Sequence, residues 1–436
     1  MVDVGGEYSI NQCIVVLLDS PPPEHATLKF AYISTALAVA AGFSLPQPAC
    51  ASLLLSPGVG APDLALAGAS VARPRNPAWA IFANPAALAG FEKAVSAVSL
   101  GLPMGTLDVR ADDNGGSIPA YDETARFLGF APDYGAVWES GGPWRFGVAI
   151  YGSVGANFNF DADPAAGVTE KFFSEVSILT VAPALAYEIT DDLSVGLAIT
   201  PLFGYARAHF AAGALPFRYK LTGPGVQANA SVAWRPSKDW RLALGLRTPG
   251  MVWMEGSMSV PVGAGASVRQ DVKLDLEMPA QVFLGCSRSL GDRLVVDASM
   301  RWTGSKSFRG SEIRFLLTPE GNTPFVAGAD DEWLVALGTE YRLNPSMVVR
   351  GGLSHATSVV GDNGESPLQM DVDDWKLSAG LGFTLGAYTF DLTVGRALGD
   401  SRFISVDEAR IFPGRYRADG GIVMFGVTTH GRGTDG

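Results

Sequence analysis

The residues that could carry acid–base, nucleophilic or metal chemistry are few and scattered. Four histidines stand singly, at His25, His209, His355 and His430. Hydrolysis of a lipid would need a nucleophile beside a general base, and only Ser354 and His355 lie together. Because neighbours in a strand point to opposite faces, these two cannot form such a couple. The three cysteines form no CxxC motif. Together with the scattered histidines, this leads us to expect no enzyme, no catalytic residue, no metal site and no cofactor.

The overall composition also excludes nucleic acid as a partner. The 436 residues include 32 Lys or Arg against 44 Asp or Glu, a net charge of -12, with no basic run to neutralise phosphates. Hydrophobic residues make up 47% of the chain, enough for a large core. The 52 glycines and the aromatic content of 10% favour many strands joined by turns over a helical bundle. The composition therefore predicts an all-β fold.

A segment near the start of the chain has the pattern of an export signal. Lys29 precedes an apolar stretch over residues 30–45, two prolines follow, and Ala49-Cys50-Ala51 has the form of a cleavage site. We therefore interpret residues 1–51 as an N-terminal extension and signal peptide. Two alternatives are a single N-terminal membrane anchor and, less favoured, a lipoprotein modified at Cys50. After Ser52 no stretch of about 20 apolar residues occurs that could form a spanning helix.

The rest of the chain alternates apolar and polar residues with a period of two. Val226–Arg235 alternates in this way, a short turn follows at Pro236–Asp239, and Leu242–Arg247 alternates again, so the two segments predict a hairpin. Leu294–Trp302 and Trp333–Arg342 repeat the pattern. Charged residues recur on only one face of these strands. This is the pattern of a barrel with a lipid-facing outside and a polar lumen.

Six short turns recur along the chain and fix the number of strands. They lie at Gly141-Gly142-Pro143, Thr190-Asp191-Asp192, Pro236–Asp239, Ser289–Asp292, Asn344-Pro345-Ser346 and Leu385-Gly386-Ala387. Six turns join twelve strands, and Ala94–Met104 and Gly421–His430 bring the total to fourteen, an even number as single-chain bacterial barrels have. Long loops are expected at residues 105–133, 206–221, 305–330 and 355–373.

Aromatic residues near both ends of the strands favour a membrane location. Trp144, Trp234 and Trp240 flank short turns, whereas Trp253 and Trp333 border long loops, as in two interfacial girdles. The alternative is a soluble propeller or sandwich, whose strands also alternate. We expect a monomeric multi-pass β-barrel in the outer membrane of a Gram-negative cell. Its partners would then be outer-membrane lipid, lipopolysaccharide and the barrel-assembly machinery.

Between the signal and the first strand lies a segment that does not alternate. Residues 53–90 are rich in glycine and alanine, too apolar for a linker, and contain Asn84-Pro85-Ala86 near their end. In this motif and its place the chain resembles the FadL family of long-chain fatty-acid and hydrocarbon transporters, as it does more weakly at Trp144–Tyr151. The resemblance implies a small N-terminal hatch, residues 52–93, that plugs a fourteen-stranded transmembrane antiparallel barrel, residues 94–436.

The family resemblance also implies a route for passive uptake. A hydrophobic molecule is captured by extracellular loops, enters the barrel, is released by a hatch movement and leaves sideways through a gap at a kink in the third strand. Gly147, Gly152 and Gly155 fall in that strand and are candidates for the lateral gate, since kinks and bulges favour glycine. The alternative is that these glycines only make room for a crowded neighbour.

Two sets of side chains are candidates for contact with the ligand. The capture candidates are aromatic: Phe127, Phe130, Phe158, Phe160, Phe172 and Phe173. They would otherwise form small local cores of the loops. A carboxylate ligand would need a cation, and alternation turns Arg247, Arg301 and Arg350 into the lumen. The alternative is that these arginines pair with the acids of the lumen, Asp297, Glu340 or Asp391, and bind no ligand. The alternative function is a general diffusion porin or a structural outer-membrane barrel, against which the hatch argues.

Overall fold

The computed structural model describes most of the chain after residue 57. The described ranges are 58–91, 94–111, 121–162, 171–212, 215–263, 266–315, 323–324, 328–361, 371–405 and 413–431. The predicted signal peptide, residues 1–51, lies outside them, as do residues 52–57 and 92–93 at the predicted limits of the hatch. Within these ranges, no helix is both long and apolar enough to cross a bilayer.

The described elements are short helices followed by strands. The helices are α3 (Ala61–Leu64), α4 (Pro77–Ala83), η1 (Pro85–Gly90) and η3 (Ser305–Gly310). The strands of the first half are β1 (Val95–Ala111), β2 (Tyr121–Leu128), β3 (Ala131–Glu139), β4 (Trp144–Phe160), β5 (Phe172–Thr190), β6 (Leu193–Ala212), β7 (Leu215–Trp234), β8 (Trp240–Arg247) and β9 (Gly250–Gly263). Those of the second half are β10 (Ala266–Met278), β11 (Gln281–Leu290), β12 (Leu294–Thr303), β13 (Glu312–Phe315), β14 (Thr323–Pro324), β15 (Glu332–Asn344), β16 (Met347–Ala356), β17 (Asp374–Leu385), β18 (Tyr388–Gly399), β19 (Arg402–Ile404) and β20 (Gly414–His430).

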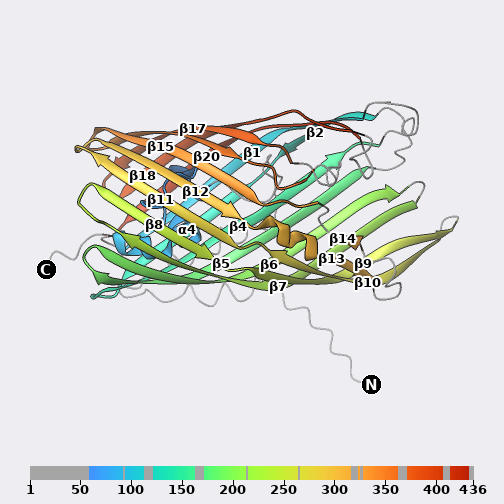
Figure 1. Cartoon of the computed structure of the whole chain (residues 1–436), viewed down its shortest axis with the longest axis horizontal. Helices are drawn as coiled ribbons and strands as arrows, with labels where there is room; N and C mark the ends of the chain where they lie inside the picture. Colours follow the sequence, from blue (N-terminus) through green and yellow to red (C-terminus); the bar gives the residue numbers. More distant parts are fainter. Residues whose placement is uncertain are drawn as a thin grey trace, which may run out of the picture.

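The strands form one closed antiparallel barrel (Figure 1). β1 pairs with β20 along its length, from Val95 opposite His430 to Arg110 opposite Arg415, and this pairing closes the sheet. Five barrel strands are interrupted and appear as two elements each: β2 with β3, β8 with β9, β10 with β11, β12 with β13, and β18 with β19. β14 pairs only with β13. Fourteen strands therefore surround the lumen, which confirms the predicted fold class and number.

All six predicted short turns join consecutive strands at one end of the barrel. They connect β3 to β4, β5 to β6, β7 to β8, β11 to β12, β15 to β16, and β17 to β18. Large side chains next to them face outward: Trp144 and Trp234 are exposed, and the Trp144 ring lies 4.6 Å from that of Tyr187. At the other end Trp253, Trp333 and Trp375 are exposed as well. The alternation thus separates a lipid-facing surface from the lumen.

The predicted extents of two long loops are wrong. β6 continues to Ala212 and β7 starts at Leu215, so most of residues 206–221 is paired strand. In residues 105–133, β1 continues to Ala111 and β2 starts at Tyr121. Strands of 17 to 20 residues exceed the roughly 9 to 11 needed to cross a bilayer. Beyond the membrane, the backbone N–H and C=O groups still find hydrogen-bond partners when the two strands go on pairing. Segments that contain glycine and proline therefore continue as strands there.

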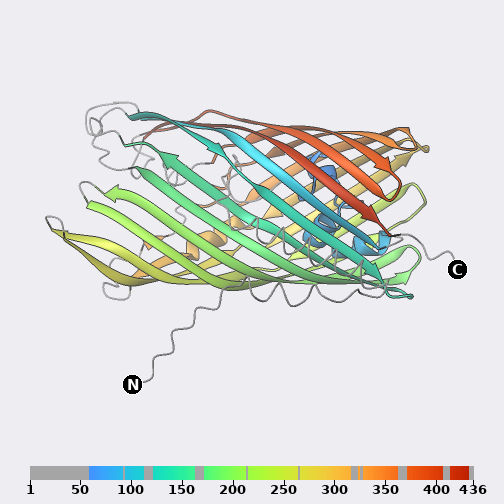
Figure 2. The same ribbon diagram turned by 180° about the vertical axis from the view of Figure 1, so that it is seen from behind.

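The segment from residue 58 to 91 lies inside the barrel, near the end with the short turns (Figure 2). Its α4 packs against the barrel wall in an aromatic group, with the Phe82 ring 5.4 Å from that of Tyr151 and 5.8 Å from that of Phe283. A separate buried cluster of apolar side chains comes mainly from β5, β6, β7, β9, β10 and η3. We call residues 58–91 the hatch segment. The lumen is thus plugged at the short-turn end, and beyond the plug an apolar cluster lines it on the side of β5 to β10.

Candidate functional site

The Asn84-Pro85-Ala86 motif fixes the hatch segment to itself and to the wall. Asn84 Nδ2 donates to the carbonyl of Val71, 2.9 Å away, which ties two parts of the segment together. Pro85 opens η1, where its missing N–H is not needed. The backbone N–H of Ala86 donates to Ser231 Oγ at 2.8 Å, and its carbonyl accepts from Ser194 Oγ at 3.0 Å. The motif therefore bonds the hatch segment to β6 and β7.

Glycines of the wall provide close seats for the hatch backbone. A Cβ at Gly135 would lie 2.2 Å from the backbone nitrogen of Ala78, and one at Gly245 would lie 2.1 Å from the carbonyl oxygen of Ala83. A Cβ at Gly196 would lie 2.2 Å from the nitrogen of Ala86. We call Gly135, Gly196 and Gly245 the seat glycines, since no larger residue fits there with the hatch in place. The sequence analysis missed them, although their alternation with outward apolar residues puts them on the lumen face.

The hatch segment also carries its own buried charges. The Asp63 carboxylate accepts from Ser70 Oγ at 2.6 Å and from the backbone N–H of Asn76 at 2.8 Å. Burial raises the pKa of Asp63 to about 7, although these bonds and the nearby charge of Arg75 oppose the rise. Arg75 Nη2 lies 2.8 Å from Asp297 of the wall. Sequence reasoning did not find Arg75, because its partner is more than 200 residues away.

Two of the three predicted lumen cations are paired with carboxylates. Arg350 Nε lies 2.7 Å from Glu340 and its Nη1 lies 2.6 Å from Asp391, two of the acids named in the alternative interpretation. Arg301 is buried, and its Nη2 lies 3.2 Å from the carboxylate of Glu332, an acid that the sequence analysis did not name. These two arginines therefore have their charges neutralised within the wall.

Arg247 has a different environment. It is only 4% exposed, and no carboxylate of the described residues lies within ion-pair distance of it. Nη2 donates to the Tyr151 hydroxyl at 2.9 Å and Nη1 donates to Gln281 Oε1 at 3.3 Å. The guanidinium carbon lies 4.4 Å from the centre of the Phe82 ring, and Nε has no acceptor. Arg247 thus contacts the hatch segment and the third barrel strand at once.

The third strand, β4, is irregular where the sequence analysis placed the gate. Its register against β5 shifts between Gly152 and Val154, so Ser153 forms a bulge. On the opposite edge, β4 pairs with β3 only as far as Tyr151, and no pairing joins β2 to β4 within the described residues. We call residues 152–160 on this edge the unpaired edge of β4.

The three gate candidates are placed differently by this geometry. Gly152 lies at the bulge, and Gly155 follows it on the unpaired edge. Gly147 lies in regular pairing between β3 and β5, where a Cβ would meet side-chain carbons of Ile81 and Leu88 at 3.0 and 3.2 Å. Gly147 thus lies close against the hatch segment, and its role as a gate residue stays a prediction.

The capture candidates lie mainly on strands, not in loops as expected. Phe160 on β4 and Phe172 on β5 are directly opposite each other and buried. Phe173 lies under the guanidinium of Arg207, 4.6 Å from the ring centre. The other three capture candidates, Phe127, Phe130 and Phe158, are less enclosed, or their side chains lie outside the described part of the chain. The Phe127 ring packs over Gly105, Phe130 is half-buried between β2 and β3, and the side chain of Phe158 lies outside the described part.

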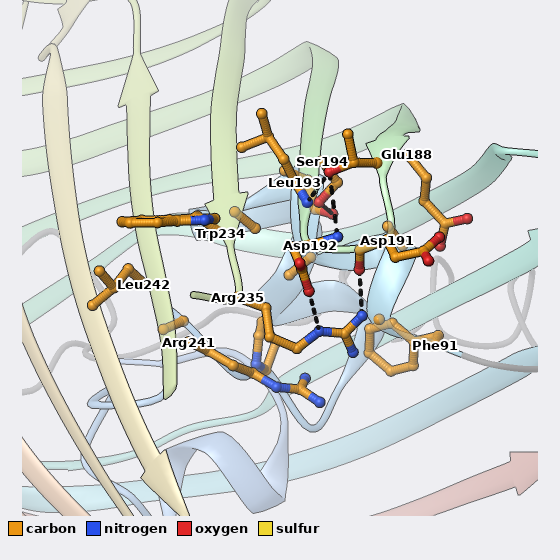
Figure 3. Close-up of a pocket in the computed structure, with 18 residues that line it drawn as sticks. Phe91, Glu188, Asp191, Asp192, Leu193, Ser194, Trp234, Arg235, Arg241 and Leu242 are labelled. Carbon is orange, nitrogen blue, oxygen red and sulfur yellow. Dashed lines mark hydrogen bonds and ion pairs between the residues drawn. The ribbon is translucent and has the colours of Figure 1, made fainter. Parts of the chain in front are cut away.

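A pocket opens at the short-turn end, between the hatch segment and the wall (Figure 3). It is lined by Phe91, by the turn from β5 to β6 and by the start of β8, and it encloses about 110 Å³. Arg235 lies 3.6 Å from the carboxylate of Asp192 and donates to the carbonyl of Asp191. Arg241 projects beside them. This charged lining differs from the apolar cluster on the side of β5 to β10 and does not suit a hydrophobic ligand.

Comparisons with known proteins agree with this geometry. Over residues 31–419 the chain matches the family described as outer membrane protein transport protein (OMPP1/FadL/TodX). Its structure is similar to that of a Pseudomonas aeruginosa FadL homologue, with 16% identity and a TM-score of 0.75, over 86% of this chain and 99% of that one. It is similar too to the Ralstonia pickettii toluene transporter TbuX, with 17% identity and a TM-score of 0.64, again over 86% of this chain and 99% of that one.

No curated protein sequence matches the chain well enough to count as a relative. At such identities the structural likeness shows the fold alone, whereas the family match covers most of the chain. This match, the closed barrel and the plugged lumen lead to one conclusion: the chain belongs to the OMPP1/FadL/TodX family of outer membrane transport proteins and is an outer-membrane β-barrel.

Proposed function

We propose that the protein takes up hydrophobic small molecules, long-chain fatty acids or hydrocarbons, passively across the outer membrane. The observation that carries the proposal is the combination of a buried apolar cluster on the side of β5 to β10, a closely seated plug and an unpaired edge on β4. A water-filled pore would not favour such a molecule, whereas a buried apolar lining does. The edge supplies a route from this lining into the bilayer that does not require the molecule to pass the hatch segment.

The proposed sequence of events uses the elements described above. Cargo is captured near Phe160 and Phe172, moves along the apolar lining and leaves between β2 and β4, while the hatch, residues 52–93, shifts within the barrel, residues 94–436. The chain transports its cargo and does no chemistry on it. Supporting this route, Ser153 at the bulge accepts a hydrogen bond from Thr180 at 2.9 Å, so the side chain that the bulge turns inward is held in place.

The test compares Gly152→Val with the matched control Gly351→Val. A branched residue favours the regular pleat, so valine at the bulge should narrow the gap, whereas a Cβ at Gly351 on β16 has its nearest neighbour 3.9 Å away. We expect uptake of radiolabelled hydrophobic compounds to fall at least several-fold in Gly152→Val alone, in cells that lack other carriers. Heat-modifiable migration in gels must show that both barrels assemble.

Two results would count against the proposal. Unchanged uptake in a well-assembled Gly152→Val barrel would leave axial passage past the hatch segment as the better account. High ion conductance of the wild-type protein in planar bilayers would instead indicate a general diffusion porin.

A further inference from the structure

On the outside of the barrel, beyond the lipid-facing surface, basic side chains lie together on two neighbouring strands. β6 and β7 run side by side toward the end away from the short turns (Figure 1). On the outward face of β6, the exposed side chain of Phe203 is followed four residues later by Arg207. Arg207 is directly opposite Lys220 of β7, and His209 is directly opposite Arg218. We call these four residues the outer basic patch.

The height of the patch above the lipid-facing band follows from the geometry of the strands. β6 begins at Leu193 after a short turn, and Phe203 is the furthest large apolar side chain exposed on its outward face. At about 3.3 Å per residue and a tilt of about 45°, this length spans about 23 Å, close to the roughly 25 Å of a lipid-facing band. By the same rise Arg207 lies about 9 Å higher. The Lys220 side chain leans back toward the membrane, with Nζ 5.7 Å from the centre of the Tyr205 ring. The patch therefore lies where lipid headgroups begin.

The acids near the patch do not neutralise it. Arg207 pairs with Glu175 of β5 at 2.5 Å, so its charge is compensated. The acid of β9, Glu255, pairs with Lys273 of β10 at 2.5 Å. Within the described part of the chain, no carboxylate lies within ion-pair distance of Lys220, whose recorded charge contact is to an aromatic ring. The patch thus keeps a positive charge on a chain whose net charge is -12.

Hydroxyl groups extend the patch onto the next strand. Ser257 of β9 is directly opposite Lys220, and Ser259 is directly opposite Arg218. Beyond the serines, β10 adds one exposed cation and one exposed acid, which cancel: Arg269 and Asp271. Cations with hydroxyl donors beside them suit a group with several charged oxygens, such as a phosphate.

We propose that the outer basic patch binds the phosphate groups of a glycolipid in the outer leaflet, the lipid A part of lipopolysaccharide. Short turns of such barrels face the periplasm, so the patch lies at the outer leaflet. The acyl chains of the same molecule would lie against the exposed apolar side chains below it, such as Ile199 and Phe203. The proposal rests on the outer-membrane location of the chain and does not depend on the proposed uptake function.

The test measures binding of diphosphoryl lipid A to the delipidated barrel in detergent, by native mass spectrometry. Dephosphorylated lipid A and inorganic phosphate are the reference ligands. We expect the phosphorylated lipid to bind most tightly, with an affinity that falls as salt is added. Lys220→Gln should weaken its binding about fivefold, and Lys220→Gln with Arg218→Gln about 25-fold, from the usual effect of one cation at an anionic lipid surface.

Two further variants separate charge from structure. Lys220→Arg keeps the cation and should bind diphosphoryl lipid A as the wild type does. The matched control Arg417→Gln removes an exposed cation of β20 that pairs with Asp419 at 2.9 Å, and it should also bind as the wild type. Heat-modifiable migration in gels must show that every variant assembles.

Three results would overturn the proposal. Equal binding of lipid A with and without phosphates would show that the patch does not recognise charge. Equal weakening in Lys220→Gln and Arg417→Gln would remove the patch as the site. Displacement of lipid A by inorganic phosphate at a similar concentration would indicate a general anion site that does not recognise the lipid. Loss of the proposed uptake function would leave the binding of lipid A unchanged.

Discussion

We predict that one methyl group added at a seat glycine opens the plug. In Gly245→Ala the new Cβ would lie 2.1 Å from the carbonyl oxygen of Ala83, and real contacts of this kind are at least 3.0 Å, so the end of α4 must retreat by about 0.9 Å. That end is also held by Asn229, whose Nδ2 donates to the carbonyls of Ile81 and Phe82 at 3.0 and 2.8 Å. A shift of this size stretches both bonds beyond hydrogen-bonding range.

The size of the destabilisation in Gly245→Ala follows from these contacts. Overpacking costs roughly 1–3 kcal/mol and each lost hydrogen bond about 1 kcal/mol, so the seated state should be destabilised by at least about 2 kcal/mol, or roughly thirtyfold in population. We expect a clear rise in single-channel conductance in planar bilayers. Gly351→Ala is the control, because its Cβ has its nearest neighbour 3.9 Å away. Equal conductance of the two variants, both heat-modifiable in gels, would refute the seating argument.

Three further predictions concern the hatch segment and the lumen charges. Deleting residues 53–90 should leave a folded barrel with raised ion conductance, because the strands pair with one another without the plug; unchanged conductance would place the segment outside the lumen. Arg301→Met should lower the temperature at which the barrel unfolds in gels, since it removes the cation 3.2 Å from the buried carboxylate of Glu332 at a cost of about 3–5 kcal/mol, whereas Arg247→Met should not; similar losses would contradict the charge assignment. Burial raises the pKa of Asp63 above its unfolded value of 3.8 to about 7, so the protonated side chain stabilises the packed hatch segment fully below about pH 3.8, and this contribution is lost as pH rises through 7. The ion conductance should therefore rise between pH 5 and 8. A flat conductance profile of the wild type over this range would argue against the role of Asp63.

The number of strands was predictable because its signals are local. Period-two alternation and turn residues such as Gly141-Gly142-Pro143 are read from adjacent positions, and all six turns were found where expected. The length of the strands was not predictable in this way. Whether Ala212 extends β6 depends on its partner Leu215 continuing β7, and the sequence of the segment itself resembles a loop.

The candidate site was predictable only as far as alternation reaches. Alternation predicts that Arg247, Arg301 and Arg350 face the lumen, because the pleat fixes the face of each residue, and all three side chains are largely buried. Which of them has a counter-charge depends on register between strands. Glu332 reaches Arg301 from across the β12–β15 pair, whereas the position opposite Arg247 is occupied by Gln281.

The contacts of the hatch segment suggest how a plug can be both tight and movable. Beyond its ion pair to the wall through Arg75, many of its bonds join its own backbone to wall hydroxyls: the N–H of Ala86 donates to Ser231, while Ser299 and Thr393 donate to the carbonyls of Gly68 and Ala61. Each such bond contributes only about 1 kcal/mol net, because water can replace it. Close seating on glycine excludes ions, and the apolar packing of α4 against the wall, with Phe82 beside Tyr151 and Phe283, has to separate before the segment can shift. Such a shift does not disturb the ladder of the barrel, because the strands pair with one another and not with the hatch segment.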